Sequence, residues 1–395
     1  MQEANRLKRL GLYLFTIIDD LKRRARERGI DVVDFGMGSP DQPTPKHIVD
    51  KLCEAAQITE NHRYSRVDGD VEKRLRRSIA AMYKRKFNID LDPDKEVLPL
   101  IGSKEGIGHL STAFLNSDDI AIVPSPAYPT HFNGVLIAGG ILYNVPLKAE
   151  QGFLPDYATI PTEVAKMAKL LFISYPHNPT GAVCDMKFFD RTVEWARGKN
   201  IIVAHDLTYS DIVFDGYKAP SFMQAEGARD FGIEFHTLSK SYNMTGWRIG
   251  YVVGNADILK TLAKTKSYLD FGIFRAVQEA AIAALDGPQD CIDRMVKIYT
   301  ERRNALVDGL NAIGWKTDKP KATFYVWTRI PLKYTALTAL EFATLMLDEV
   351  GVVVSPGTGF GEDGEGYVRF ALVEPVERIK LALQKIKTFF EKRTD

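Results

Sequence analysis

The chain has 395 residues, of which 45% are hydrophobic, and its 52 basic and 51 acidic residues give a net charge of +1. That length allows two or three domains with a large buried core, and the balanced charge argues against an electrostatic surface for nucleic acid. We therefore expect small-molecule partners and no nucleic acid. The cysteines, Cys53, Cys184 and Cys291, share no metal-binding or redox spacing, which predicts no metal site and fits a reducing, cytoplasmic compartment.

The first apolar run, residues 10–18, has the length of a signal-peptide core. It lacks a small-residue cleavage site and continues into charged residues, which signal sequences do not do. We therefore predict a helix that enters the fold, with a signal sequence as the alternative. No other stretch approaches the length of a membrane span, so no membrane partner is expected.

Short apolar runs alternate with amphipathic segments from about residue 96 to 254, and several runs are apolar throughout rather than at every second residue. Continuous apolar runs are typical of strands covered on both faces of a parallel sheet. The predicted strands are 96–102, 120–126, 141–147, 169–176, 201–206, 233–239 and 249–254, and helices are predicted over 104–116 and 186–200. This pattern predicts an α/β fold with a mostly parallel sheet.

The remaining segments differ in character. Two long helical stretches, 256–285 and 289–313, are divided by Gly287-Pro288. Strand-like 322–330, a helix over 337–350, strand-like 352–356, a glycine-rich stretch and a last amphipathic helix follow. We predict a large domain over residues 40–285 and a smaller α+β domain built from the two chain ends, 1–39 and 286–395.

Functional groups of an open parallel sheet lie beyond the carboxyl ends of its strands. At those ends the sequence places Ser103 and Lys104, Tyr128, Asn178, Asp206 with Tyr209, and Ser239 with Lys240. Lys240 is the most informative, because a lysine at the end of a buried strand is costly unless it is paired, neutralised or covalently occupied. The alternative is a strand that ends at the surface with its lysine in water.

Together these groups fit pyridoxal 5′-phosphate. Lys240 can hold the cofactor aldehyde as a Schiff base, and Asp206 can stabilise the protonated ring nitrogen. The start of the helix after Gly102 offers backbone amides and a favourable dipole for the phosphate. Ser239, Arg248 and Thr237 can supplement those amides.

Eight short strings occur in one order along nearly the whole chain. They are DFGMGSPDQPTP, NHRYS, IGSKEG, PSPAYPTH, SYPHNPTG, HDLTYSD, SKSYNMTGWRIG and SPGTGFGEDGEGYVRFAL. In this order they resemble the signatures of class I/II aminotransferases, the fold-type I enzymes that use pyridoxal phosphate. The appearance is closest to bacterial alanine aminotransferases.

The resemblance implies roles for individual residues. Lys240 would carry the cofactor and move the proton at the substrate α-carbon, Asp206 would hold the pyridinium, and Asn178 and Tyr209 would bind the phenolic oxygen. Tyr128 would stack on the ring. Ser103, Lys104, Ser239 and Arg248 match the phosphate site.

Three further residues are implied by the same resemblance. Arg369 would grip the substrate α-carboxylate with a bidentate fork, and Gly38 would bring backbone close to that carboxylate. Asn178 would also contact substrate. Tyr64 matches a tyrosine that reaches the phosphate of a neighbouring subunit, so a homodimer with shared active sites is implied.

Each of these residues has an ordinary structural alternative when it is taken singly. The alternatives are a turn at Asn178, a helix cap at Asp206, core rings at Tyr128 and Tyr209, an exposed charge at Arg369 and a loop glycine at Gly38. Their joint occurrence at strand ends favours the cofactor site. His177 and His205 are interpreted as packing residues or as supports for the neighbouring site residues. Arg275 falls where the family pattern has an uncharged residue; it is interpreted as a surface charge, with a charge at the entry channel as the alternative.

A carboxylate held in the plane of the cofactor ring favours loss of the α-hydrogen over loss of carbon dioxide. Transamination is therefore predicted ahead of decarboxylation, with β-elimination left open. Alanine is favoured as the amino donor and 2-oxoglutarate or pyruvate as the oxo acid; aspartate, methionine and LL-diaminopimelate remain alternatives. A non-enzymatic ligand sensor is the least favoured hypothesis. Sensors of this kind carry a DNA-binding domain ahead of the aminotransferase part, and here the family pattern starts by residue 34, which leaves no room for one.

Overall fold

The computed structural model describes the whole chain except residues 1, 12–13, 66–68 and 393–395. Its centre is a seven-stranded sheet with the strand order β2-β8-β7-β6-β5-β3-β4. The strands are β2 (Val97–Leu100), β3 (Ile120–Ser125), β4 (Ile141–Pro146), β5 (Ala168–Ser174), β6 (Ile202–Asp206), β7 (Gly232–Thr237) and β8 (Gly250–Gly254). All run parallel except β8, which is antiparallel to both of its neighbours. The prediction of seven strands in a mostly parallel sheet is confirmed.

Both faces of the central strands are buried, which explains why several of the strands are apolar throughout. On β5, Leu171 and Ile173 pack into the core beneath one set of helices, and Leu170 and Phe172 pack beneath the other. The first face is covered by α4 (Asp70–Phe87), α8 (Met186–Ala196) and α11 (Arg275–Asp286). The second is covered by α5 (Ser103–Phe114), α6 (Pro129–Ala138) and α10 (Ala256–Leu269).

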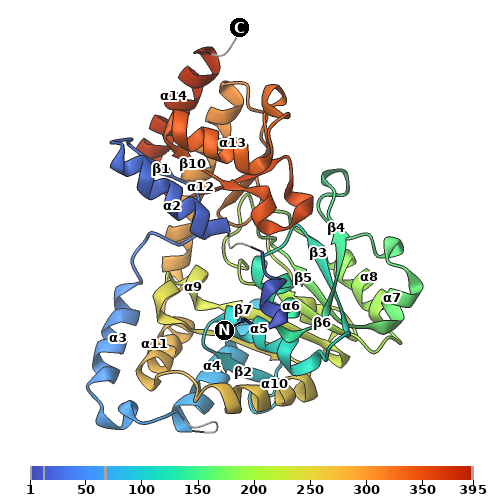
Figure 1. Cartoon of the computed structure of the whole chain (residues 1–395). Coiled ribbons are helices and arrows are strands. Elements are labelled where there is room, and N and C mark those ends of the chain that lie inside the picture. The colour runs from blue at the N-terminus through green and yellow to red at the C-terminus, as the bar shows by residue number, and fades with distance from the viewer. Residues whose placement is uncertain (1, 12–13, 66–68, 393–395) are drawn as a thin grey trace.

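Residues near the two chain ends form a smaller α+β unit, drawn in blue, orange and red in the upper part of Figure 1, while the short first helix, α1, lies against α6 of the large domain. Strand β1 (Val33–Asp34) pairs in parallel with β10 (Val352–Val353), and β11 (Ser355–Pro356), β12 (Tyr367–Ala371) and β9 (Tyr325–Arg329) form an antiparallel sheet. The helices of this unit are α2 (Leu14–Glu27), α12 (Asp290–Ala312), α13 (Ala339–Leu345) and α14 (Val376–Lys392). The domain boundaries at 39/40 and 285/286 stay a prediction.

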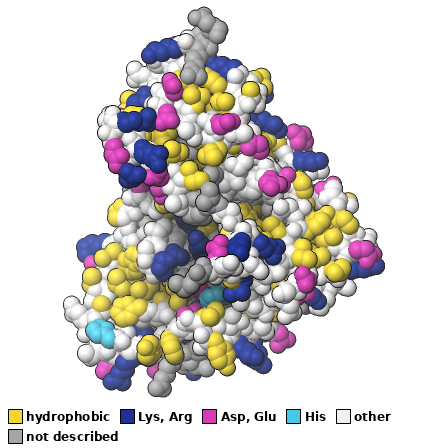
Figure 2. Space-filling view, viewed as in Figure 1, with side chains coloured by type: hydrophobic (Ala, Val, Ile, Leu, Met, Phe, Trp, Pro, Cys, Tyr) yellow, Lys and Arg dark blue, Asp and Glu magenta, His cyan; other side chains and the backbone are white. Residues whose placement is uncertain are grey.

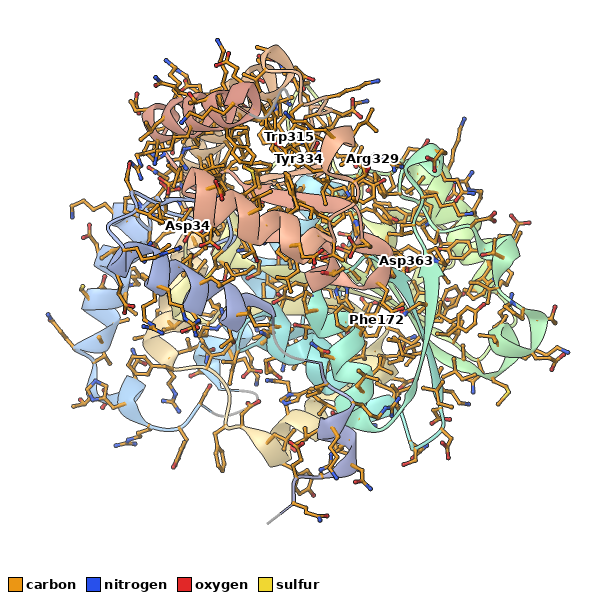
Figure 3. The ribbon with its side chains drawn as sticks, turned by 45° about the horizontal axis from the view of Figure 1, so that its top comes forward. Asp34, Phe172, Trp315, Arg329, Tyr334 and Asp363 are labelled. Atoms are coloured by element: carbon orange, nitrogen blue, oxygen red, sulfur yellow. The ribbon has the colours of Figure 1, made fainter. Side chains whose placement is uncertain are left out.

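The smaller unit has a core of its own. Trp315 is fully buried and packs against Phe342 and Phe370. Figure 3 shows Trp315 and Tyr334 in this upper unit and Phe172 in the large sheet below. The remaining helices are α1 (Asn5–Lys8), α3 (Lys46–Ala56), α7 (Thr162–Met167) and α9 (Leu238–Ser241).

The helix predicted over 256–285 is in fact two helices, α10 and α11. Gly272 has a φ of +82°, in the left-handed region, and its backbone amide donates a hydrogen bond to Asp270 Oδ1 at 2.8 Å. This local turn interrupts the helix, because a left-handed residue cannot continue a right-handed one. The apolar periodicity continued across the turn and concealed it.

Helix α2 covers part of the predicted entry helix, and residues 12–13 of that segment lie outside the described residues. Among the helices of the described residues, none is long and apolar enough to cross a membrane. On the face shown in Figure 2, Lys and Arg side chains are interspersed with Asp and Glu. This mixture agrees with the balanced net charge.

Candidate active site

The carboxyl ends of the large sheet meet at a cavity of about 420 Å³. The residues that line it come from segments far apart in the chain, because parallel strands bring their carboxyl ends to one edge. The lining residues named from the sequence are Gly38, Ser103, Lys104, Tyr128, Asn178, Asp206, Tyr209, Thr237, Ser239, Lys240 and Arg248. Those not foreseen are Ser39, Thr208, Thr245 and Tyr325.

Lys240 lies on α9, directly after β7, and its amine faces the cavity. Its Nζ donates a hydrogen bond to the carbonyl oxygen of Gly38 at 2.9 Å. Burial lowers the pKa of Lys240 to about 7, helped by the positive charges of Arg369 and Arg248 and opposed by Asp206. A large fraction of this amine is therefore neutral and nucleophilic at neutral pH.

Asp206 ends β6 and is buried. Burial by itself would raise the pKa of this carboxyl, but the hydrogen bond from His131 and the hydroxyl and amide of Thr208 outweigh it, and the pKa is lowered. His131 Nε2 lies 3.1 Å from Asp206 Oδ2, and its ring stacks on Phe172 at 5.4 Å between centroids. Asp206 is thus an anion held in place at the cavity floor.

His131 was missed by the sequence analysis. It belongs to the PSPAYPTH string, three residues after Tyr128, and its ring also meets the Tyr128 ring edge-on. A histidine near an aromatic residue carries no local signal for a carboxylate partner on another strand. Only the pairing order of the sheet brings α6 over the end of β6.

A pair of tyrosines forms one wall of the cavity. The hydroxyls of Tyr209 and Tyr325 lie 2.9 Å apart, and burial, with the neighbouring Tyr325, raises the pKa of Tyr209, so its hydroxyl keeps its proton. Gly38 lies against the same wall, since a Cβ atom there would be 2.1 Å from the Tyr325 hydroxyl. Gly38 is therefore required by close contact, whatever its backbone angles.

Arg369 lies beside the cavity rather than in its lining. It is 2% exposed, and its guanidinium donates to Asn178 Oδ1 at 2.8 Å and to the Gly36 carbonyl at 3.1 Å. The guanidinium carbon lies 4.0 Å from the centroid of the Tyr325 ring. The structure thus joins Arg369 to Asn178, two residues that the sequence analysis named separately.

The edge of the cavity assigned to phosphate contains the N-terminus of α5. Gly102, with φ +76°, packs so closely that a Cβ atom would lie 2.5 Å from Arg248 Nη2. The backbone amide of Ser239 donates to Thr237 Oγ1 at 3.1 Å. Helix-start amides, an arginine and small hydroxyls are the groups that bind phosphate esters in proteins.

Tyr64 does not reach this cavity. Its side chain is 75% exposed and its ring lies 4.7 Å from that of Phe271. Arg275, interpreted from the sequence as a surface charge, donates hydrogen bonds to the backbone carbonyls of Glu60 and Tyr64, at 2.8 Å each. It ties that loop to the start of α11.

The two histidines beside the motifs have internal partners. His177 Nδ1 lies 2.7 Å from Thr180 Oγ1, and burial lowers the pKa of His177 to about 3. His205 Nδ1 lies 2.8 Å from Glu234 Oε2. Both contacts agree with their interpretation as packing residues.

Comparison with known proteins gives the same family as the motifs. The family described as Aminotransferase class I and II matches residues 30–386. The chain belongs to this family. Its cofactor is pyridoxal 5′-phosphate, and the cavity fits it, since it offers a neutral amine, a fixed carboxylate and glycine-lined approaches where a Cβ would clash.

The similar proteins include enzymes with different names. The chain is 50% identical to an LL-diaminopimelate aminotransferase of Moorella thermoacetica, with 98% of each chain covered. It is 46% identical to the glutamate-pyruvate aminotransferase AlaC of Escherichia coli, over 98% of this chain and 93% of that one. The substrate-bound structure of BacF from Bacillus subtilis is 36% identical, covers 98% of each chain and superimposes with a TM-score of 0.93.

Proposed function

We propose that this aminotransferase works by a ping-pong cycle centred on Lys240, in which an L-amino acid leaves its nitrogen on the cofactor and a 2-oxo acid removes it. The observation that carries the proposal is a lysine amine with a pKa of about 7 at the same cavity as a buried, ionised aspartate. Neither group is stable in isolation at such a site. Both are useful if a cofactor joins the amine and presents a cationic ring to the carboxylate.

Each residue then has a definite task. When bound, pyridoxal phosphate supplies an electron sink for negative charge at the substrate α-carbon. Asp206 would keep the ring nitrogen protonated through its own negative charge, and Lys240, once released, would take and return the proton at the α-carbon. Tyr209 would donate a hydrogen bond from its hydroxyl to the phenolic oxygen.

Asn178 and Arg369 act as a pair in this proposal. Because Asn178 Oδ1 accepts from Arg369, the amide nitrogen of Asn178 is the end left to donate toward the cofactor. Arg369 holds the substrate carboxylate with its guanidinium and keeps the covalent bond between the α-carbon and its hydrogen in position for cleavage. Ser103, Lys104, Ser239 and Arg248 bind the phosphate, and Tyr128 lies against the ring.

For the amino donor we propose LL-diaminopimelate first and alanine second. The sequence alone had favoured alanine. Support comes from relatives named LL-diaminopimelate aminotransferase, at 47% to 50% identity. Alanine is the second candidate, supported by the 46% identity to AlaC. Glutamate and 2-oxoglutarate are the proposed shared pair.

The first experiment is a visible absorption spectrum of the protein with pyridoxal phosphate, before and after LL-diaminopimelate, L-alanine, L-glutamate or L-aspartate is added singly. We expect the amino donor to convert the spectrum to the pyridoxamine form and the matching oxo acid to restore it. The ratio of kcat/KM for LL-diaminopimelate and alanine ranks the two donors. Steady release of ammonia without an oxo acid would instead indicate β-elimination.

The role of Lys240 is tested separately. Borohydride reduction followed by peptide mass spectrometry should place the cofactor on Lys240, and Lys240→Ala should abolish turnover while cofactor still binds without a covalent link. Turnover of Lys240→Ala at the wild-type rate would refute the mechanism.

We also propose a homodimer in which Tyr64 reaches the cavity of the second copy. Support comes from exposed aromatic residues: Phe271, which contacts Tyr64 and is 69% exposed, and Tyr268 and Phe274 in the same segment of the chain, at 84% and 48% exposure, since exposed apolar patches mark interfaces. Light scattering should give twice the chain mass of 44.3 kDa. A cytoplasmic location stays a prediction from the cysteine pattern.

A further inference from the structure

The turn that begins α5 is closed by a side chain from within the helix. Glu105 is the third residue of α5, and its Oε2 accepts a hydrogen bond from the backbone amide of Ile101 at 3.0 Å. The turn between them contains Gly102, whose backbone lies directly against the Arg248 guanidinium. The bond to Glu105 therefore holds the turn that brings the first residues of α5 to the edge of the cavity.

A charged carboxylate in this position has an electrostatic cost. Burial alone would raise the pKa of Glu105, but the hydrogen bond from His109 and the charge of Lys266 outweigh burial and lower it, so Glu105 is ionised at neutral pH. A phosphate bound at the N-terminus of the same helix would be repelled by that charge, because like charges in a partly buried site are weakly screened. The charge on Glu105 must be balanced nearby.

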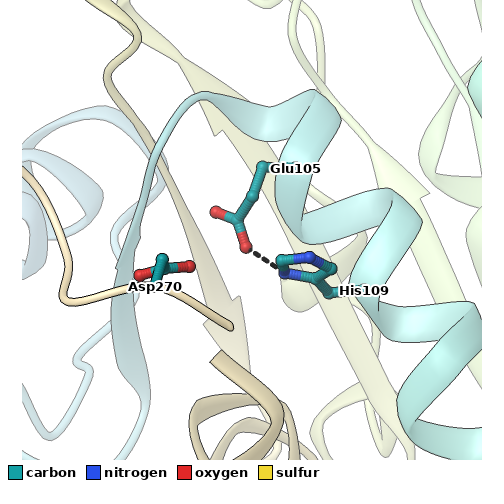
Figure 4. Close-up of side chains that lie close together, drawn as sticks. All are labelled: Glu105, His109 and Asp270. Atoms are coloured by element: carbon teal, nitrogen blue, oxygen red, sulfur yellow. Dashed lines mark hydrogen bonds and ion pairs between the residues drawn. The ribbon is translucent and has the colours of Figure 1, made fainter. Parts of the chain in front are cut away.

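Lys266 provides this balance from the neighbouring helix α10. It is 7% exposed, and its Nζ donates to Glu105 Oε2 at 2.9 Å and to Asp270 Oδ2 at 3.0 Å. On the other side, His109 Nδ1 lies 2.5 Å from Glu105 Oε1, and Figure 4 shows this contact as a dashed line. Glu105, His109 and Asp270 lie close enough together to hold a metal ion, but the ammonium of Lys266 already lies between the two carboxylates.

We propose that Glu105 and Lys266 are positioning residues for the phosphate of the cofactor. Glu105 shapes the turn at Gly102, and Lys266 offsets part of the negative charge that Glu105 and Asp270 would otherwise present to the phosphate. The inference rests on the proposed cofactor site at Lys240. Its consequence is that this pair affects binding of a phosphorylated ligand and leaves binding of the unphosphorylated aldehyde nearly unchanged.

The test compares dissociation constants of pyridoxal phosphate and of pyridoxal, measured by absorbance titration of cofactor-free protein. Lys266→Met should weaken binding of pyridoxal phosphate on the order of tenfold, since a charge left unbalanced in a partly buried site costs about that much. Binding of pyridoxal should change less than about twofold. The double variant Glu105→Gln with Lys266→Met should recover most of the loss, because removing one negative and one positive charge returns the net charge of this group, Asp270 included, to its wild-type value.

Lys264→Met is the matched control, because Lys264 is an exposed lysine on the same helix, and it should bind both ligands as the wild type does. If Lys266→Met does not fold, Lys266→Gln replaces it in both the single and the double variant, and thermal unfolding is measured for each variant. An equal loss for both ligands, or a double variant no better than Lys266→Met, would overturn the inference. Absence of borohydride-trapped cofactor on wild-type Lys240 would instead overturn the proposed function.

Discussion

Replacing Lys240 by methionine should make the cofactor-free protein more stable at neutral pH. The amine has a pKa of about 7 in the folded protein, against 10.5 for an unperturbed lysine. Its protonated form is thus disfavoured by folding, chiefly because burial removes water from the charge. Methionine has similar length and no charge to bury.

The magnitude follows from the pKa shift. One pKa unit corresponds to about 1.4 kcal/mol, so the charged amine lowers the free energy of unfolding by on the order of 5 kcal/mol below pH 7. From pH 7 to 10.5 the unfolded chain holds a proton that the folded protein has released, so wild-type stability rises with pH. Lys240→Met lacks this rise, and its advantage should shrink by about 2 kcal/mol between pH 7 and pH 9.

The assay is urea unfolding of cofactor-free protein, followed by circular dichroism at pH 7, 8 and 9 and at constant protein concentration. The hydrogen bond from Lys240 to the Gly38 carbonyl is lost in the variant, which subtracts about 1 kcal/mol at every pH. Lys264→Met, with an exposed lysine, should show no pH-dependent difference from wild type. An advantage of Lys240→Met that is absent, or that does not change with pH, would refute the reasoning.

Three further predictions concern the same cavity. Asp206→Asn should lower kcat by about a hundredfold or more in steady-state assays, because a neutral amide cannot balance a charged ring nitrogen; Asp206→Glu should retain more activity. Gly38→Ala should raise the KM for the amino acid by about tenfold, because the added Cβ would lie 2.1 Å from the Tyr325 hydroxyl. The dissociation constant of the cofactor should stay close to that of the wild type. His131→Phe removes the hydrogen bond between His131 Nε2 and Asp206 Oδ2, at 3.1 Å, so that burial raises the pKa of Asp206. Because Asp206 is then protonated at a higher pH, the acidic limb of the plot of kcat against pH should move to higher pH. An unchanged pH profile in His131→Phe would show that this bond does not control Asp206.

Much of the site could be predicted because its groups follow apolar strands directly in the sequence. Asp206 ends IIVAHD, and Lys240 comes three residues after β7. Parallel strands covered on both faces need continuous apolar runs, and their carboxyl ends share one edge, so the position after each run indicates the site. The break at Gly272 was missed for the opposite reason, since apolar residues lie at helical spacing on both sides of it.

The sequence by itself determined the mostly parallel sheet and the order of the strand-end groups, Lys240 among them, because these depend on local periodicity and on residues adjacent to it. Only the tertiary structure decided which residues support them: His131 against Asp206, Tyr325 against Gly38, and Lys266 against Glu105. Each partner lies on a different element, and its contact exists because two elements pack together. Such contacts depend on the packing of helices over the sheet and of the smaller unit over its edge, and no pattern in the surrounding residues encodes them.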